Sequence, residues 1–319
     1  MRKIVANSRM PESIITELEK EFYLIIPPGT DDFTDDEMLE LVKDADAVLC
    51  LRLRKVMNEW IDNAERLKVI GNVAVGFDNI DVAYAMQKKV AVVNTPEMVR
   101  EVTAELAVTL MLSMSRGIVR HHMELSKSLR CSTPFFLDKD MLVYGKTLGI
   151  IGCGRIGKAV AAKAQGLGMK TVYYDPFRLK PEDEKALGLT YMPFEELLAS
   201  GDIISIHMPY TTETYHLMNE KTFALMKPSA YFINTARGPI VDEASLIRAL
   251  KNKVISGAAL DVYEFEPSVP MELAALENLI IVPHVGTLTL ESRTAMVAEA
   301  VSGIRAVLCG EIPKNLVRI

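Results

Sequence analysis

The 319-residue sequence has little cysteine, no excess of basic residues and no long apolar run. Its four cysteines lie far apart, without the paired spacing of a zinc site or a redox dithiol, so we interpret them as free thiols in a reducing compartment. A formal net charge of −6 provides no basic surface for nucleic acid. No apolar run approaches the roughly 20 residues of a membrane-spanning helix. These absences argue against disulfide scaffolds, nucleic-acid-binding proteins and membrane proteins.

The overall composition is that of an ordinary globular protein. Hydrophobic residues make up 49% and charged residues 24% of the chain, close to the average for soluble domains. The N-terminus, Met1-Arg-Lys-Ile-Val, has no charged and then apolar targeting segment. We therefore expect a cytoplasmic protein of about two domains, with neither a membrane nor a nucleic acid as partner.

Short apolar segments alternate with helical patterns in the first part of the chain. Four segments are too short for helices and are expected to be strands: Arg2–Ala6, Ala47–Leu51, Leu67–Gly71 and Ala91–Asn94. Four segments between them have apolar residues at helical spacing: Pro11–Phe22, Asp35–Asp44, Val56–Ala64 and Val82–Lys88. Such alternation predicts a parallel sheet with helices on both faces.

A second alternation follows a long helical pattern from Glu101 to about Leu129, which is a candidate dimer surface. Six more strands are expected after it: Thr147–Ile151, Lys170–Tyr174, Ile203–His207, Tyr231–Thr235, Ser256–Leu260 and Leu279–Val282. The pattern predicts an α/β fold with two doubly wound parallel sheets, the second of the dinucleotide-binding type. It leaves open whether the second sheet is inserted into the first domain.

A glycine-rich loop joins the first strand of the second alternation to the helix after it. The segment Gly152-Cys-Gly-Arg-Ile-Gly157 has GxGxxG spacing within the strand–loop–helix context of a dinucleotide fold. Gly152 permits the tight turn, Gly154 lets the backbone approach a pyrophosphate, and Gly157 lets helix and strand pack closely. The helix N-terminus offers unpaired N–H groups, and Arg155 adds a positive charge. We therefore expect this loop to hold a pyrophosphate.

An acidic residue ends the next expected strand. Asp175 follows Val172-Tyr-Tyr, where a carboxylate accepts hydrogen bonds from the adenosine ribose hydroxyls and repels a 2′-phosphate. Arg178 and Lys180 follow closely and soften this discrimination. The sequence therefore favours NAD as the cofactor and disfavours NADP without excluding it.

Three chemically suited side chains follow the last three expected strands, where an open parallel sheet binds its ligands. They are Arg237 after Asn234-Thr-Ala, Glu266 before Pro267, and His284 after Pro283. A nicotinamide-dependent reaction at a hydroxyl needs a cation that polarises the carbonyl, an acid/base, and a group that tunes that acid/base. The alternative is a surface arginine, a turn glutamate and a loop histidine.

Taken together and in this order, the motifs resemble the D-isomer-specific 2-hydroxyacid dehydrogenases. The resemblance runs from about Val48 to the C-terminus, through Ala74–Asp81, the glycine loop, Asn234–Gly238, Glu266-Pro267 and Pro283-His284. Within the family it is greatest to glyoxylate/hydroxypyruvate reductases and to the 3-phosphoglycerate dehydrogenase catalytic core. It implies a flavodoxin-like substrate domain, residues 1–98 and 288–319, around an inserted Rossmann NAD-binding domain, residues 99–287.

The resemblance also implies roles for individual residues. His284 would be the acid/base, Glu266 would hydrogen-bond its imidazole and favour the protonated form, and Arg237 would bind the substrate carboxylate and polarise the keto oxygen. The backbone amides of Val75 and Gly76 would hold the other side of the carboxylate. No metal is expected, and the expected assembly is a homodimer through the NAD-binding domain. The cofactor contacts would be Thr103, Gly152, Gly154, Arg155, Ile156, Gly157, Asp175, Pro209, Thr214, Thr235, Ala236, Arg237, Asp261, His284 and Gly286.

The loop Arg52-Leu-Arg-Lys55 bears on the choice of substrate. The resemblance implies that this loop reaches the substrate, and phosphoglycerate-type members carry an arginine near here. Arg52 and Leu53 are therefore candidate substrate contacts, and Arg52 or Arg54 would accept a second anionic group such as a phosphate. The alternative is a set of basic residues on a solvated loop.

The sequence thus predicts an NAD-dependent dehydrogenase that reduces small 2-oxo acids of the glyoxylate or hydroxypyruvate type. A 3-phosphoglycerate dehydrogenase of serine synthesis is the first alternative. A dinucleotide-sensing protein similar to the corepressors of this family is the second. A formate dehydrogenase is disfavoured, because that branch pairs its histidine with glutamine where Glu266 stands here.

Overall fold

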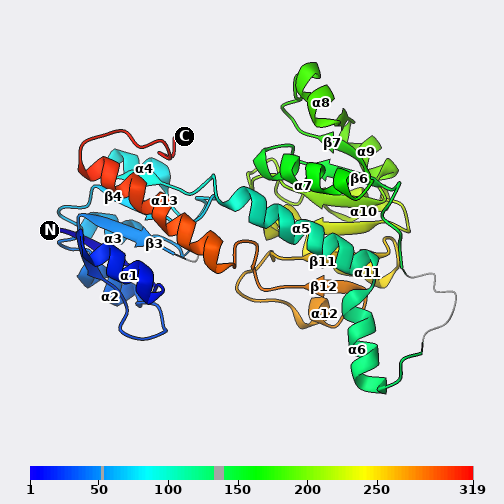
Figure 1. The fold of residues 1–319 in the computed structure, drawn as a ribbon, viewed down its shortest axis with the longest axis horizontal. Coiled ribbons are helices and arrows are strands. Elements are labelled where there is room, and N and C mark those ends of the chain that lie inside the picture. The colour runs from blue at the N-terminus through cyan, green and yellow to red at the C-terminus, as the bar shows by residue number, and fades with distance from the viewer. Residues whose placement is uncertain (52–53, 133–139, 319) are drawn as a thin grey trace. The chain divides into compact units, whose positions relative to one another are not determined.

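The computed structural model describes residues 1–51, 54–132 and 140–318. The chain divides into two compact units (Figure 1). Unit 1 comprises Met1–Val99 and Leu288–Ile319, and unit 2 comprises Arg100–Thr287. Each unit contains one wholly parallel sheet with helices around it, which confirms the expected α/β fold with two parallel sheets.

Unit 1 has a five-stranded sheet in the order β2-β1-β3-β4-β5, the flavodoxin order. Its strands are β1 Arg2–Ala6, β2 Phe22–Ile25, β3 Ala47–Cys50, β4 Val69–Asn72 and β5 Ala91–Val93. Its helices are α1 Glu12–Glu19, α2 Asp35–Leu41, α3 Asn58–Asn63, α4 Val82–Gln87 and α13 Leu290–Leu308. The central strands β3 and β4 are buried throughout, because both faces of a parallel sheet are covered, and they therefore have nearly continuous apolar sequences.

The C-terminal helix α13 returns to the sheet of unit 1 and packs against β3, β4 and β5. Gly71 in β4 permits this close packing, since a Cβ atom there would lie 2.7 Å from Cδ1 of Ile304. Arg305 on the same helix forms an ion pair with Glu21 at 2.7 Å. The two ends of the sequence therefore build one unit.

Unit 2 has a seven-stranded sheet in the order β12-β11-β10-β9-β6-β7-β8, which contains the Rossmann order 3-2-1-4-5-6. Its strands are β6 Thr147–Ile151, β7 Lys170–Tyr174, β8 Thr190–Tyr191, β9 Ile203–Ile206, β10 Tyr231–Asn234, β11 Gly257–Leu260 and β12 Leu279–Ile281. Its helical segments are α5 Val99–Ser115, α6 Ile118–Ser128, α7 Arg155–Gly166, α8 Pro181–Leu187, α9 Phe194–Ser200, α10 Glu220–Ala224, the 3₁₀ helix η1 Gly238–Ile240, α11 Glu243–Lys251 and α12 Met271–Ala274.

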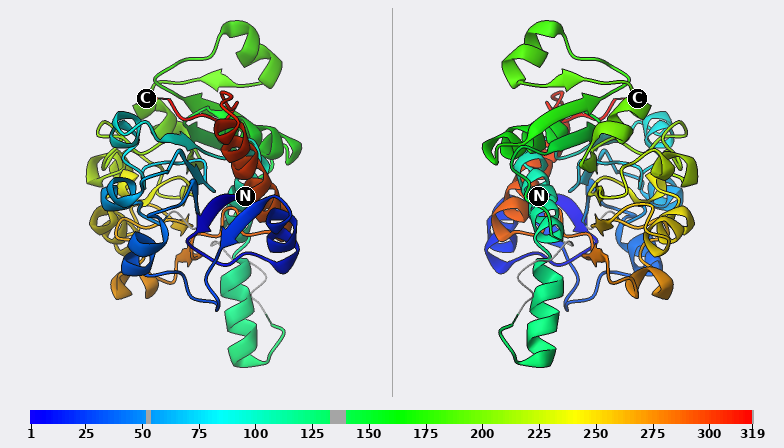
Figure 2. Two further views of the ribbon diagram at one scale, coloured as in Figure 1. Left: turned by 90° about the vertical axis from the view of Figure 1, so that its left-hand side faces the viewer. Right: turned by 90° about the vertical axis from the view of Figure 1, so that its right-hand side faces the viewer.

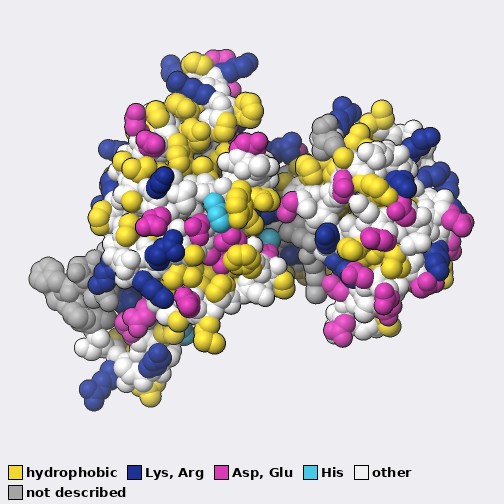
Figure 3. Space-filling model, turned by 180° about the vertical axis from the view of Figure 1, so that it is seen from behind, with side chains coloured by type: hydrophobic (Ala, Val, Ile, Leu, Met, Phe, Trp, Pro, Cys, Tyr) yellow, Lys and Arg dark blue, Asp and Glu magenta, His cyan; other side chains and the backbone are white. Residues whose placement is uncertain are grey.

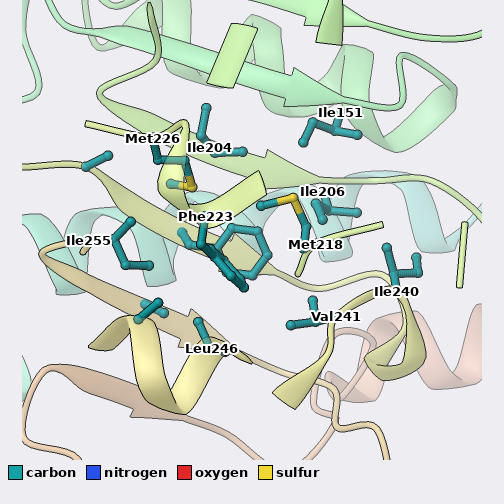
Figure 4. Close-up of a cluster of buried hydrophobic side chains, with 14 of the residues drawn as sticks. Ile151, Ile204, Ile206, Met218, Phe223, Met226, Ile240, Val241, Leu246 and Ile255 are labelled. Carbon is teal, nitrogen blue, oxygen red and sulfur yellow. The ribbon is translucent and has the colours of Figure 1, made fainter. Parts of the chain in front are cut away.

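An apolar core beneath the sheet of unit 2 anchors the loops that leave its strand ends (Figure 4). Phe223 is fully buried and meets Phe232 edge-on, with ring centroids 5.4 Å apart. Ile240 and Val241 belong to the same cluster. Ile240 and Val241 lie only three and four residues after Arg237. The packing of these two side chains in the core therefore fixes the backbone beside Arg237.

The expectation of a single helix from Glu101 to Leu129 is wrong. The structure has α5 and α6 there, bent by 54° at the break. Gly117 between them has a φ of 58°, the left-handed conformation that ends an α-helix and that glycine adopts readily. The sequence pattern also misses β2 and the two-residue strand β8.

Helix α6 stands away from the sheet of unit 2 (Figures 1 and 2). None of its residues is buried, although Ile118 and Leu125 are apolar. Among the described residues no single helix is long and apolar enough to cross a membrane, whereas the bent pair α5 and α6 meets that length and composition together.

Candidate active site

The glycine loop lies between β6 and α7, and its three glycines differ in their surroundings. Gly152 has a φ of 94°, and a Cβ atom there would lie 2.7 Å from the carbonyl carbon of His207. A Cβ atom on Gly157 would overlap with the carbonyl oxygen of Gly152. At Gly154, by contrast, a Cβ atom would meet nothing within 4 Å, and φ is −72°. The fold itself therefore requires two of the glycines, and Gly154 leaves open space at the N-terminus of α7, where phosphates bind.

Asp175 follows β7, and its carboxylate is directed at the glycine loop. Oδ2 accepts a hydrogen bond from the Cys153 amide at 2.8 Å, and Oδ1 accepts one from the Phe177 amide at 2.9 Å. An ionised carboxylate offers about four acceptor positions. The Cys153 and Phe177 amides therefore occupy about half of the acceptor positions of this carboxylate.

Further candidate cofactor residues follow β9 and β10 at the same edge of the sheet. The Thr214 hydroxyl donates to the Pro209 carbonyl at 2.9 Å and accepts from the Thr211 amide at 2.7 Å. The Ala236 amide donates to Asn234 Oδ1 at 2.9 Å. Within the described part of the chain, the buried hydroxyl of Thr235 has no hydrogen-bond partner. An unsatisfied buried hydroxyl is costly, so its presence here fits a bound polar group.

His207 directly follows β9 but is unsuited to proton transfer. Its Nε2 lies 2.9 Å from the Ser205 hydroxyl. Burial lowers the pKa of His207 to about 4, so the ring is neutral near pH 7. A general acid for reduction has to carry its proton at that pH, so a lowered pKa makes His207 less suited to the role.

His284 and Glu266 meet at the ends of β12 and β11. The Nδ1 atom of His284 lies 2.9 Å from Glu266 Oε2, and Glu266 Oε1 accepts from the Tyr263 amide at 2.9 Å. The pKa of Glu266 is lowered overall. Burial raises it, but the hydrogen bond and charge of His284, the Tyr263 amide and the charge of Arg237 together outweigh burial. The carboxylate is therefore ionised near neutral pH, and it fixes the orientation of the imidazole.

The loop that carries His284 is held in an unusual conformation. His284 has a φ of 52°, a left-handed conformation that costs a non-glycine residue about 1 kcal/mol or more. The two residues after His284 are held by the carboxylate of Asp261. Its oxygens accept hydrogen bonds from the Val285 amide at 2.6 Å and from the Gly286 amide at 2.9 Å. Burial raises the pKa of Asp261 to about 6, and the two amides limit that rise. The Thr103 hydroxyl donates to the Gly286 carbonyl at 3.4 Å.

Arg237 follows β10 and lies close enough to Glu266 to affect its ionisation. The Nη1 atom of Arg237 donates to the Ala236 carbonyl at 2.8 Å. A Cβ atom on Gly238 would overlap with the Tyr263 carbonyl group. The loop of Arg237 therefore packs directly on the loop of Glu266, and unit 2 brings Arg237, Glu266 and His284 together.

A second histidine–carboxylate pair lies beside the first and is missed by the sequence reasoning. His216 Nε2 lies 2.6 Å from Glu264 Oε1, and Glu264 and Glu243 each accept from the other's backbone amide, at 3.1 and 2.6 Å. The only sequence signal is the alternation of glutamates at 264 and 266.

The remaining site candidates lie in unit 1. The Val75 and Gly76 carbonyls accept from the side-chain amides of Asn94 and Asn72, both at 2.8 Å. Arg54 contacts the Phe33 carbonyl, pairs with Asp35 at 2.6 Å and lies over the ring of Trp60 at 5.3 Å. The guanidinium of Arg54 is therefore engaged by residues of unit 1. Arg52 and Leu53 are outside the described residues.

Comparison with known proteins identifies the family. The family model described as "D-isomer specific 2-hydroxyacid dehydrogenase, NAD binding domain" matches residues 108–286. A glyoxylate reductase of Thermococcus litoralis is 42% identical over 99% of this chain and 96% of its own length. A glyoxylate reductase of Pyrococcus furiosus is 39% identical over 99% of this chain and 95% of its own.

Solved structures agree with the sequence comparison. A structure from Thermus thermophilus has a TM-score of 0.90 and 33% identity, covering 99% of this chain and all of its own. An NADPH-dependent glyoxylate/hydroxypyruvate reductase of Sinorhizobium meliloti, in complex with NADP and malonate, has a TM-score of 0.85 and 27% identity, covering 99% and 96%. The chain therefore belongs to the D-isomer-specific 2-hydroxyacid dehydrogenases, close to the glyoxylate reductases, and is an oxidoreductase that uses a nicotinamide dinucleotide.

Proposed function

We propose that the enzyme reduces small 2-oxo acids such as glyoxylate and hydroxypyruvate with NADH. The observation that carries this proposal is the His284–Glu266 pair at 2.9 Å beside Arg237. A proton donor with a paired carboxylate suits a carbonyl that becomes a hydroxyl. A protein that only senses a dinucleotide would not need that pair.

The three side chains divide the chemistry among them. The nicotinamide, when bound, supplies the hydride that goes to the carbonyl carbon. Arg237 binds the substrate carboxylate and polarises the keto oxygen. His284 gives its proton from Nε2 to that oxygen, and Glu266 stabilises the imidazolium through Nδ1. In the oxidative direction the neutral imidazole takes the same proton back.

The two units have separate roles in this proposal. Unit 2 binds the dinucleotide through the residues of the strand ends and the glycine loop. Unit 1 is the substrate domain in this proposal, and its candidate substrate contacts are the backbone amides of Val75 and Gly76. The Asp175 carboxylate favours NAD over NADP because it accepts from the ribose and repels a 2′-phosphate. A relative at 27% identity is named as NADPH-dependent. The proposed preference for NAD therefore rests on Asp175 of this chain and not on the family.

The commitments of Arg54 favour a small acid over a phosphorylated one. Its guanidinium already pairs with Asp35 and covers Trp60, and only 19% of the side chain is exposed. Of the two arginines considered for a second anionic group, Arg54 is thus engaged within unit 1, and Arg52 lies outside the described residues. The reduction of a small acid needs no contact to a second anionic group, so it agrees better with the engagement of Arg54.

We further propose that the protein is a homodimer through α6. Ile118 and Leu125 are 56% and 49% exposed, and their spacing of seven residues places them on one face of the helix, while Leu129 at the C-cap is 85% exposed. A second copy would cover this apolar face around a two-fold axis.

The substrate proposal predicts a clear order of activities. NADH oxidation at 340 nm should give a kcat/KM for glyoxylate or hydroxypyruvate at least about tenfold above that for 3-phosphohydroxypyruvate, because no second anion is bound. Pyruvate serves as the unphosphorylated comparison. A preference for the phosphorylated acid would identify the enzyme as the serine-synthesis type instead.

The acid/base assignment predicts two different defects. His284→Ala should lower kcat for reduction by about 10²–10⁴. Glu266→Gln should move the alkaline decline of kcat/KM to lower pH, because the imidazolium loses its neighbouring anion. The control is Glu272→Gln, which changes an exposed carboxylate in α12. Normal turnover by His284→Ala, or an unmoved pH profile in Glu266→Gln, would contradict the assignment.

The glycine loop predicts a separation of stability from binding. Gly154→Ala should leave the free energy of unfolding within about 0.5 kcal/mol but weaken ADP-ribose binding about tenfold, since the added methyl group occupies the pyrophosphate space. Gly157→Ala should cost about 1–3 kcal/mol of stability through the overlap with Gly152. Calorimetric titration and urea unfolding measure the two effects. Unchanged ADP-ribose affinity in Gly154→Ala would place the pyrophosphate elsewhere.

The dimer proposal predicts that Leu125→Glu gives a monomer in sedimentation velocity experiments, since a charge on the apolar face cannot be buried unpaired. Ile312→Glu changes an equally apolar and 77% exposed residue of unit 1 and should leave the dimer intact. If Leu125→Glu sediments as the wild type does, the dimer uses another surface.

A further inference from the structure

Arg178 is the cation nearest in sequence to the carboxylate that selects the ribose, and it is held by another residue. It lies three positions after Asp175. Its Nε donates to Glu184 Oε1 at 2.8 Å, and its Nη2 donates to Glu184 Oε2 at 3.1 Å. A bidentate pair of this kind fixes both the position and the orientation of a guanidinium. Arg178 itself is exposed, so a bound anion would find it accessible if this pair were broken.

Glu184 is anchored from the interior of unit 2. Its side chain is only 13% exposed, and Oε1 also accepts from the Tyr173 hydroxyl at 2.8 Å. The Tyr173 hydroxyl in turn accepts from the Leu179 amide at 2.9 Å. Tyr173 is fully buried in β7. The hydrogen bond from Tyr173 therefore fixes the position of the Glu184 carboxylate, and Arg178 binds to a carboxylate that is already held in place.

An aromatic ring holds the guanidinium from a second direction. The Cζ atom of Arg178 lies 4.8 Å from the ring centroid of Tyr191 in β8, and that ring meets Tyr173 edge-on at 5.5 Å. Acidic and basic side chains lie next to each other at this end of unit 2, around α8 (Figure 3). The cation is thus engaged by a carboxylate and by a π face.

We infer that Glu184 is a cofactor-specificity residue that acts by holding Arg178 away from a 2′-phosphate. In dinucleotide folds an arginine near the ribose carboxylate is the group that accepts the 2′-phosphate of NADP. Here Asp175 repels that phosphate and Glu184 withholds the arginine that would compensate. The inference rests on the proposed preference for NAD and assigns a second residue to it.

The test compares ADP-ribose with its 2′-phosphate by calorimetric titration, because neither probe needs hydride transfer. Glu184→Gln should raise the affinity for the 2′-phosphorylated probe relative to ADP-ribose about three- to tenfold. Adding Arg178→Ala should abolish the gain, whereas adding Lys180→Ala should retain it. Tyr191→Leu releases Arg178 from its other side and should change the ratio in the same direction.

The matched control is Glu182→Gln, which removes a neighbouring negative charge from the first turn of α8. An equal gain in this control would reduce the effect to general electrostatics and overturn the inference. An unchanged ratio in both Glu184→Gln and Tyr191→Leu would do the same, as would a gain that survives the loss of Arg178. The affinities of the wild type alone test the NAD preference, so the two ideas fail separately.

Discussion

The carboxylate of Asp261 supports the geometry on which the proposed chemistry depends. It binds the amides of Val285 and Gly286 and so holds His284 in a left-handed conformation that an unconstrained chain rarely adopts. In that conformation Nδ1 of His284 meets Glu266 at 2.9 Å. Since Asp261 directly follows β11 and His284 follows β12, the parallel pairing of these two neighbouring strands brings both loops to one edge of the sheet. The proposed acid/base pair therefore depends on a buried carboxylate that need not contact the substrate.

Much of this arrangement is readable from the sequence, because its signals are local. The strands β3, β6 and β10 are buried on both faces, so they appear as apolar runs, and the glycine spacing lies directly after one of them. The strand β2 is harder to predict, since only alternate residues are buried and it follows α1 after a short turn. Likewise, nothing in the apolar pattern marks the break at Gly117, whose left-handed φ separates α5 from α6.

Interactions between distant residues are what the sequence does not contain. The pairing of His216 with Glu264 and of Glu264 with Glu243 depends on two loops and the first turn of α11, which meet only in the folded unit. The position of Arg54 is similar, because its partner Asp35 belongs to a helix that precedes it by 19 residues. The residues of the glycine loop show the reverse case. Their spacing is plain in the sequence, but only the structure separates Gly157, which packing requires, from Gly154, which it does not.

Two further glutamates, Glu264 and Glu243, lie close to the His284–Glu266 pair, so the environment of each carboxylate affects its ionisation. Each carboxylate has a different environment: Glu266 faces His284, Glu264 faces His216, and Glu243 is buried. Burial raises the pKa of Glu243, a backbone hydrogen bond from Glu264 opposes the rise, and the charges of Glu264 and Glu266 add to it. The pKa values of Glu243 and Glu266 are therefore shifted in opposite directions, because burial dominates at Glu243 whereas the hydrogen bond and charge of His284 dominate at Glu266. In the proposed mechanism, the carboxylate that faces the imidazole of His284 is thus the one whose pKa is lowered, Glu266.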